Sequence, residues 1–393
     1  MDKTLDLTGI PKEVLLILEL TKDSESPFSK EKQEALCIKL NWTLFLEYAL
    51  HHRLFPRLYS NIRKIDNQWI PSFVKEQLDH YYKWNTFQML QLSAEMEYVS
   101  KIFSDIGINT IFLKGPVVAK DLYGDISLRT SRDLDFLIPI QHLVRAEEFL
   151  TQQGYEKEYD FETVLNDWRW RHRHVTYFHP QKQVKLEIHW RLHPGPGKEP
   201  SFQELWERKR ISGLTNFPVH FLGREDLLIF LVTHGARHGW SRLRWLDDIQ
   251  QLMKLPVDWE FTYQLSKSSH NLDIMGQAMV LASQLLESTI TNEMKLFIRG
   301  ARAHTLAQEA IFYLEKMVNL HTDPVPEEIT NYHTRHLFSL MSAYQKFFFL
   351  LSLMYPYPID VETLPLPKKL HFLYFPLRPL LMVWRKTRKL ALP

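Results

Sequence analysis

The stretch IFLKGPVVAKDLYGDISLRTSRDLDFLI, residues 111–138, decides the fold of this chain. Its first three residues are apolar and predict a short strand, which ends in the turn Lys114-Gly115. Pro116 suits the first position of a helix, and the apolar residues behind it predict a short helical segment. After a polar loop, residues 134–138 predict a second strand. The stretch is therefore predicted to fold as strand, turn, helix, loop and strand.

Two aspartates mark the start of the second predicted strand. Residues two apart in a strand point to the same side, so Asp133 and Asp135 project together. Leu134 and Phe136 then point into a core. No Lys or Arg stands between the aspartates in the sequence, and two adjacent carboxylates repel one another unless a cation binds them. Oxygen ligands of this kind suit Mg²⁺ or Mn²⁺, which also bind the phosphates of a substrate.

This order of elements resembles a known fold. A strand, a Lys-Gly turn, a helix, a loop with Arg129 and Arg132, and an Asp-x-Asp are similar to the nucleotidyltransferase fold of the DNA polymerase β-like superfamily. More narrowly, the stretch resembles a bacterial family of uncharacterised nucleotidyltransferases whose turn reads Leu-Lys-Gly. The wider superfamily more often has Gly-Ser or Gly-Gly there, so Lys114-Gly115 departs from the broad pattern. The resemblance covers roughly residues 90–255.

A third carboxylate is predicted on a later strand. In residues 184–190, VKLEIHW, Glu187 and His189 share one face, and the apolar side chains share the other. Beside the Asp-x-Asp strand, Glu187 would present a third acid. The resemblance implies the same, because the corresponding segment of the family reads acid-x-His-Trp. It implies that Asp133, Asp135 and Glu187 bind the cations and are catalytic, and it places His189 in the nucleotide site.

Basic residues around this unit are candidates for phosphate contacts. Lys114 offers a point charge, and Gly115 lets the backbone approach a phosphate at the start of the following helix, although an ordinary tight turn explains both. Arg129 and Arg132 either contact the β- or γ-phosphate or pair with nearby acids. A second basic cluster is either a solvated loop or a contact to pyrophosphate or the acceptor; it consists of Arg169, Arg171, His172, Arg173 and His174.

A histidine- and tryptophan-containing segment also resembles the family, and it comprises His234, His238, Trp240, Leu243, Trp245 and Asp248. His234 and His238 are four residues apart on a predicted helix, but a glycine follows His234 where zinc proteases carry a Glu. Two ligands also fall short of a zinc site, so none is predicted. Our hypothesis places Trp245 and Asp248 in the nucleotide or acceptor pocket. The alternative for the two tryptophans, stacking on a base, is weaker than burial in the core.

The composition is that of an ordinary globular protein. Hydrophobic residues make up 45% and charged residues 24% of the 393, and the net charge of +2 gives no broad electrostatic reason to bind nucleic acid. The single cysteine, Cys37, excludes an intramolecular disulfide. No apolar run reaches the roughly 18 residues of a spanning helix, and the N-terminus lacks a signal-peptide pattern. We therefore expect a cytoplasmic protein without a transmembrane segment.

The chain divides into four predicted regions, and its fold class is α+β. Residues 1–105 are predicted to be helical, and residues 106–195 to hold a small mixed β-sheet, the nucleotidyltransferase core. Residues 196–323, which follow a Pro- and Gly-rich break, are predicted to form a helical substrate or lid region. Residues 324–393 are rich in Pro and aromatics and are expected to pack against the rest, although docking on a protein partner or a membrane surface remains open.

The longest predicted helix covers residues 71–106. Aromatic and aliphatic side chains at helical spacing usually form core. We therefore expect a buried stripe that includes Phe73, Leu78, Tyr81, Trp84, Phe87, Leu90, Leu92 and Met96.

The function implied by the resemblance is transfer of a nucleoside monophosphate from an NTP to an acceptor hydroxyl or phosphate, with release of pyrophosphate. Neither the NTP nor the acceptor follows from the sequence, and the acceptor can be a small molecule, a peptide or tRNA. Three alternatives stay open: γ-phosphoryl transfer as in a kinase, a non-catalytic nucleotide-binding scaffold, and an enzyme that modifies nucleic acid. Three acids kept together argue against a scaffold, and near-neutral charge argues against nucleic acid.

Overall fold

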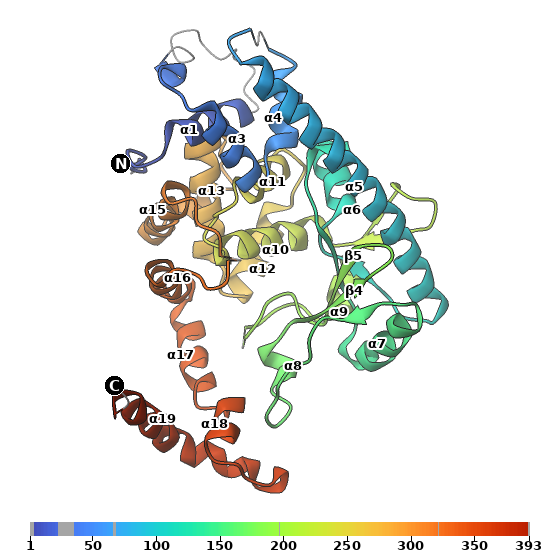
Figure 1. Cartoon of the computed structure of the whole chain (residues 1–393), viewed down its shortest axis with the longest axis vertical. Helices are drawn as coiled ribbons and strands as arrows, with labels where there is room; N and C mark the ends of the chain where they lie inside the picture. The colour runs from blue at the N-terminus through green and yellow to red at the C-terminus, as the bar shows by residue number, and fades with distance from the viewer. Residues whose placement is uncertain (1–3, 23–34, 66–67, 196, 321, 392–393) are drawn as a thin grey trace.

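The computed structural model describes residues 4–22, 35–65, 68–195, 197–320 and 322–391, and it has the predicted α+β architecture (Figure 1). Within these residues seven strands form one mixed sheet in the order β3-β4-β5-β2-β1-β7-β6. The strands are β1 (Ile111–Phe112), β2 (Asp133–Leu137), β3 (Glu156–Lys157), β4 (His174–His179), β5 (Val184–His189), β6 (Arg210–Ser212) and β7 (Val219–Phe221).

The register of the central strands follows from the alternation of apolar and polar residues. Strand β2 pairs antiparallel with β1 and parallel with β5, and Leu134 lies opposite Leu186. Leu134, Phe136 and Leu186 are completely buried, as predicted. Because side chains alternate between the two faces of a sheet, the intervening polar residues of both strands share the other face.

The sheet is larger than the sequence predicted. Residues 210–221, expected to be helical, form strands β6 and β7, and β7 pairs parallel with β1 through Phe112 and Phe221. A strand of three residues is too short to show a periodic pattern. Its pairing partner lies about one hundred residues earlier in the chain, so the tertiary contact decides its conformation.

The described residues before the sheet include the helices α1 (Lys12–Thr21), α3 (Trp42–His51), α4 (Phe55–Ile62) and α5 (Ser72–Asp105). The long helix α5 confirms the predicted one and runs along one side of the molecule in Figure 1. The predicted core stripe is partly wrong. Leu78, Leu92 and Met96 are buried, but Phe73, Trp84, Phe87 and Leu90 are 47–77% exposed. The helix covers its neighbours with one face only, and these four side chains lie on the other.

The remaining helices of the body are α6 (Pro116–Tyr123), α7 (Leu143–Gln152), α8 (Trp168–Arg171), α9 (Phe202–Arg208), α10 (Arg224–Arg237), α11 (Leu243–Met253), α12 (Trp259–Ser268), α13 (Leu272–Leu286), α14 (Lys295–Ile298) and α15 (Ala301–Glu315), with short 3₁₀ turns η1 (Ile126–Leu128) and η2 (Ile140–His142). One continuous hydrophobic core draws residues from Ile10 to Leu340. The N-terminal helices, the sheet and α10–α15 share it, so the predicted region boundaries remain predictions. Residue 196, in the predicted break, lies outside the described residues.

The C-terminal segment comprises α16 (Glu327–Leu340), α17 (Ala343–Ser352), α18 (Pro358–Thr363), the 3₁₀ turn η3 (Lys368–Leu373) and α19 (Tyr374–Ala391). We expected it to pack against the rest of the chain, and α16 does, because Leu340 joins the main core and His336 Nε2 lies 3.1 Å from Ala236 O. The helices after α16 pack against the body less closely. A second small hydrophobic cluster joins Tyr374 and Leu381 to Val164. Helices α17, α18 and α19 extend away from the body in Figure 1. Within the described ranges, no helix combines the length and apolarity needed to cross a bilayer.

Candidate active site

Three neighbouring strands bring the predicted acids and two histidines to one face of the sheet. Strands β2 and β5 run parallel with Asp135 directly opposite Glu187. Strand β4 runs antiparallel to β5 and places His174 opposite His189. Asp133 lies two residues before Asp135 on the same strand and is half-buried. The sheet thus gathers Asp135, Glu187 and the two histidines into one polar cluster.

The contacts within this cluster are short. His189 Nε2 lies 3.2 Å from Asp135 Oδ1 and 3.3 Å from Glu187 Oε2. The Lys114 ammonium lies 2.9 Å from Asp135 Oδ1, and His174 Nε2 lies 3.8 Å from Glu187 Oε2. The sequence showed no cation between the aspartates. In the folded chain, Lys114 and His189 are the positive neighbours of Asp135.

Burial and these neighbours set the protonation of the cluster. Burial opposes charge on His189, but its hydrogen bonds to Asp135 and Glu187 outweigh burial and raise its pKa. Burial likewise opposes charge on Glu187, yet the His189 hydrogen bond and the charges of His189 and Lys114 hold the pKa of Glu187 below its usual range. Burial and the nearby His189 lower the pKa of His174 to about 3. At neutral pH the cluster therefore contains ionised Glu187 and neutral His174.

The donor set fits a divalent cation. Among the described residues, His174, Glu187 and His189 form a group of potential ligands whose atoms all lie within 4.8 Å of one another. Arg173 Nε donates to His174 Nδ1 at 3.1 Å, which leaves the neutral ring protonated at Nε2, so His174 suits a hydrogen bond to Glu187 better than a metal bond. Asp135 Oδ2 is buried without a partner among the described residues. Carboxylate oxygens of Asp135 and Glu187 are ligands for Mg²⁺ or Mn²⁺.

The turn before the site requires a glycine. Gly115 has φ +93°, and a Cβ there would lie 3.3 Å from Leu134 Cδ2. Helix α6 begins directly after it, with Pro116 at its first position. The backbone N–H groups at the start of this helix lie next to Lys114, as the predicted phosphate contact requires. That contact stays a prediction.

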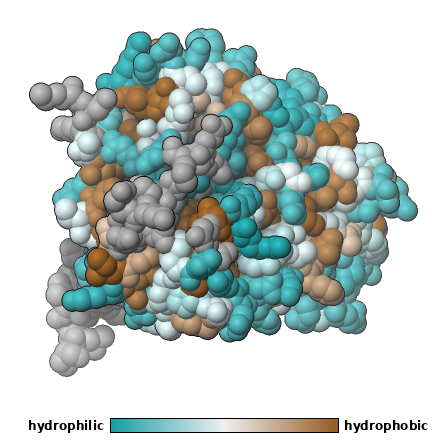
Figure 2. Space-filling view, turned by 90° about the horizontal axis from the view of Figure 1, so that it is seen from above, coloured by the Kyte–Doolittle hydropathy of each residue, from teal (hydrophilic) through white to brown (hydrophobic). Residues whose placement is uncertain are grey.

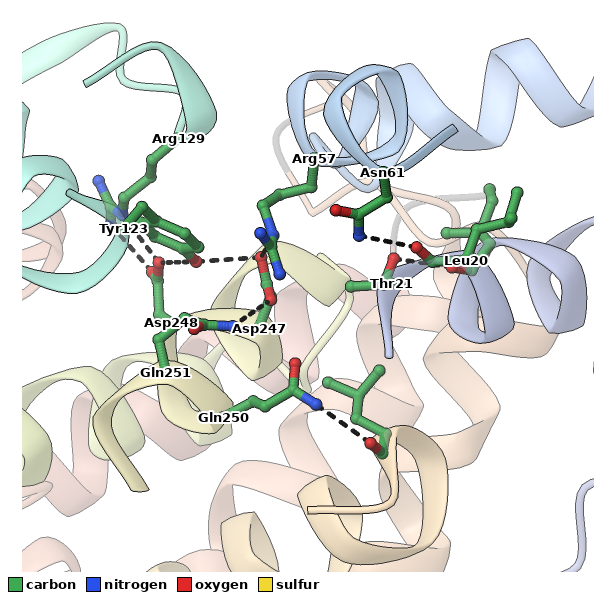
Figure 3. Close-up of polar contacts among 12 residues, drawn as sticks. Leu20, Thr21, Arg57, Asn61, Tyr123, Arg129, Asp247, Asp248, Gln250 and Gln251 are labelled. Atoms are coloured by element: carbon green, nitrogen blue, oxygen red, sulfur yellow. Dashed lines mark hydrogen bonds and ion pairs between the residues drawn. The ribbon is translucent and has the colours of Figure 1, made fainter. Parts of the chain in front are cut away.

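Arg129 and Asp248, both predicted to lie in the nucleotide site, contact each other. Arg129 Nε and Nη2 lie 2.9 and 3.0 Å from the two carboxylate oxygens of Asp248, and both side chains are fully buried (Figure 3). Tyr123 Oη lies 2.9 Å from Asp248 and 3.0 Å from Asp247. Arg57 Nε lies 3.2 Å from Asp247. This buried network joins α4, α6 and α11. Of the two alternatives for Arg129, a phosphate contact or an ion pair with an acid, the structure shows the ion pair.

Helix α10 forms the wall opposite the sheet. Burial and the nearby charge of Lys114 keep the pKa of His234 well below its ordinary value, so its ring is neutral. The Trp245 ring packs 5.3 Å from His234 and 5.2 Å from His238. A Cβ on Gly235 would lie 2.5 Å from the Trp240 ring, which explains the glycine after His234. Both tryptophans are buried, so the core interpretation of them is the one that the structure favours.

Two cavities with basic residues in their lining lie near the polar cluster: one borders Arg132, which precedes Asp133 in the chain, and the other borders His174. One, of about 420 Å³, is lined by Arg53, Arg132, Tyr81 and Trp84. Burial and the charges of Arg242 and Arg132 lower the pKa of Arg53 to about 10, and its Nε is buried without a partner among the described residues. The other, of about 480 Å³, is lined by residues that include Arg173, His174 and Arg237. Burial and the charge of Arg173 lower the pKa of Arg237 to about 9.

The sequence missed several residues of this site. Arg53 lies far from the decisive stretch and follows His51 and His52, a basic run that we passed over. Arg173 and His174 were identified only as a basic loop cluster, one of whose alternatives was contact with the acceptor. Their position beside β5 depends on the antiparallel pairing of β4 with β5, which alternation within each strand does not specify.

A family comparison covers the part of the chain that contains this site. The family described as "Uncharacterised nucleotidyltransferase" matches residues 39–287, more than half of the chain. The chain belongs to this family. The match covers the N-terminal helices from α3, the sheet and α10–α13. No curated protein sequence matches the chain.

Part of the chain is also similar to the crystal structure of an antigenic nucleotidyltransferase-like protein from Paracoccidioides brasiliensis. The sequence identity is 17% and the TM-score 0.32, and the similarity covers 51% of this chain and 94% of that one. A similarity of this size adds nothing to the assignment of the site.

Proposed function

We propose that this nucleotidyltransferase moves a nucleoside monophosphate from an NTP to an acceptor hydroxyl or phosphate and releases pyrophosphate. One observation carries the proposal: the parallel pairing of β2 and β5 sets Asp135 opposite Glu187, beside the Lys114-Gly115 turn. Family membership supports nucleotidyl transfer in general, and the site residues are our assignment.

The proposed cation is Mg²⁺ or Mn²⁺, held by Asp135 and Glu187 with Asp133 at the edge. When bound, it neutralises charge on the phosphates of the substrate. Asp135 Oδ2 is buried without a hydrogen-bond partner among the described residues, and such an ion would bind this oxygen as a ligand. Lys114 then adds charge toward the phosphates, and the glycine at position 115 admits them to the start of α6.

Glu187 has a defined task in this scheme. Its pKa lies below the usual range, so it is a weak base and favours orientation of the acceptor hydroxyl over early removal of its proton. His189 holds Asp135 and Glu187 in place through its two contacts. Of the two basic cavities, one takes the nucleotide phosphates and the other an anionic acceptor.

Labelled nucleotides test the proposal. We would incubate the protein and a host-cell extract with NTPs labelled at the α- or the γ-phosphate. Label from the α-position alone should enter a product larger than the nucleotide, and Asp135→Asn should remove it. Transfer of the γ-label alone would replace the proposal with kinase-like transfer. Absence of transfer from all of ATP, GTP, CTP and UTP would contradict it.

A further inference from the structure

Exposed apolar side chains are concentrated near the C-terminus. Of the 25 large apolar side chains that are exposed among the described residues, fourteen lie between residues 338 and 384. On the face of the molecule seen from above, by contrast, apolar residues are scattered among hydrophilic ones (Figure 2). Scattered exposed apolar residues are normal in a globular protein, whereas a continuous group of them marks an interaction surface.

Helix α19 exposes apolar side chains to solvent and buries a charged one. Tyr374, Arg378 and Leu381 lie on its buried side, and Arg378 pairs with Asp360 of α18. On its outer side, Leu380 is 66% and Val383 63% exposed. The ion pair between Arg378 and Asp360 is thus buried, while much of the apolar surface of α19 faces solvent.

Helix α17 also exposes apolar side chains to solvent. None of its residues is buried, and Phe347 and Leu350 are 58% and 53% exposed. Phe372, in the 3₁₀ turn before α19, is 56% exposed. Together α17, α18, η3 and α19 form an arm, residues 343–391, that extends from the body (Figure 1). We call this the C-terminal arm.

The C-terminal arm is basic as well as apolar. After Glu362 the sequence has no Asp or Glu, and residues 364–393 contain seven Lys and Arg. Lys368 and Lys369 are exposed next to Phe372. A surface that combines basic residues with exposed Phe, Leu, Val and Trp is complementary to anionic lipid headgroups above a hydrocarbon layer. A symmetric dimer through the arm would bring the same basic residues together, which costs energy.

We propose that the C-terminal arm lies on the surface of a lipid bilayer that contains anionic lipids. The apolar outer side of α19 and the side chains of Phe372 and Trp384 enter the boundary between headgroups and acyl chains. Lys368 and Lys369 contact the anionic headgroups. The arm binds without crossing the bilayer. This inference does not rest on the proposed nucleotidyl transfer, because the arm lies outside the matched residues 39–287.

Vesicle co-sedimentation tests the proposal with the full chain. The protein should sediment with vesicles of phosphatidylcholine and phosphatidylglycerol, and less with phosphatidylcholine alone. Added salt should weaken the binding. The double variant Leu380→Asp/Val383→Asp should bind at least about tenfold more weakly, because two apolar side chains leave the bilayer. Lys368→Gln/Lys369→Gln should lose about fivefold per lysine on anionic vesicles only.

The matched control is Phe87→Asp/Leu90→Asp, which changes two equally exposed side chains on α5, away from the arm. It should bind vesicles like the unchanged protein. Circular dichroism must show that each variant is folded. No sedimentation with anionic vesicles, or equal loss in both double variants, would overturn the proposal. A dimer in light scattering that Leu380→Asp/Val383→Asp dissociates, without vesicle binding, would instead assign the surface to a second copy of the chain.

Discussion

Two of the buried charge clusters in the described part of the chain differ in how their carboxylate oxygens are paired. In the network on α11, both oxygens of Asp247 and both of Asp248 have partners, and the side chains of Arg129 and Asp248 are fully buried. In the cluster on the sheet, Asp135 Oδ1 contacts both Lys114 and His189, while Asp135 Oδ2 has no hydrogen-bond partner among the described residues.

The two clusters also differ in how much side-chain surface is exposed to solvent. The side chains of Lys114 and Glu187 keep 14% and 17% of their surface exposed, and a basic cavity reaches His174 beside them. In the network, the side chains of Arg129 and Asp248 have no exposed surface. All four carboxylate oxygens of the network are paired, although Arg129 Nη1 has no hydrogen-bond partner among the described residues. The unpaired oxygen of Asp135 is an acceptor atom that a bound cation would satisfy.

The largest effect is expected from Asp135→Asn. The substitution keeps the volume and removes the charge on which the cation site depends, so transfer of α-label should fall by about a thousandfold. Stability should fall by only about 2 kcal/mol or less, because His189 can release its proton when the carboxylate is gone. Urea unfolding measures the second quantity. If the loss of activity is explained by unfolding, Asp135 has a structural role like Asp248, and the proposed difference between the clusters is wrong.

The opposite pattern is expected from Asp248→Asn. Arg129 would keep a buried charge without its bidentate partner, so the free energy of unfolding should fall by about 3–5 kcal/mol. The folded fraction should still bind nucleotide, because the side chains of Arg129 and Asp248 are fully buried against each other. Unfolding in urea at low temperature measures the loss. A stable variant that fails to bind nucleotide would restore Asp248 as a ligand contact.

The sequence predicted the acids better than their surroundings. The Asp-x-Asp strand, Glu187 and the turn at Gly115 follow from alternation and turn chemistry, which are local. The partners of Arg129 were not predictable, because Asp248 lies more than one hundred residues away on another helix. Strand β7 and the exposed side of α5 also depend on long-range packing. Local patterns thus predict which residues share a face, and tertiary contacts decide what that face meets.

A smaller effect is expected from Glu187→Gln. Without its charge the side chain still accepts hydrogen bonds, but it orients the acceptor poorly, so kcat should fall about a hundredfold. The Kd for the nucleotide should change much less. Steady-state kinetics and calorimetry give the two values. Equal losses in kcat and affinity would make Glu187 a binding residue.

The smallest effect is expected from Arg53→Gln in the basic cavity. Loss of one charged hydrogen-bond donor should weaken binding of NTP or of an anionic acceptor about tenfold, with the fold unchanged. Arg63→Gln changes an exposed arginine directly after α4; it is the matched control and should bind like the unchanged protein. Identical affinities in the two variants would remove the cavity from the site.

Calorimetric titration of Mn²⁺ with ATP, GTP, CTP and UTP into the unchanged protein, Asp135→Asn and Asp248→Asn tests the central claim most directly. The comparison between the two clusters predicts that the unchanged protein and folded Asp248→Asn bind one of these nucleotides with similar affinity. Asp135→Asn should show no cation-dependent binding. Unchanged affinity in Asp135→Asn, with loss in folded Asp248→Asn, would place the nucleotide at the α11 network and contradict the account.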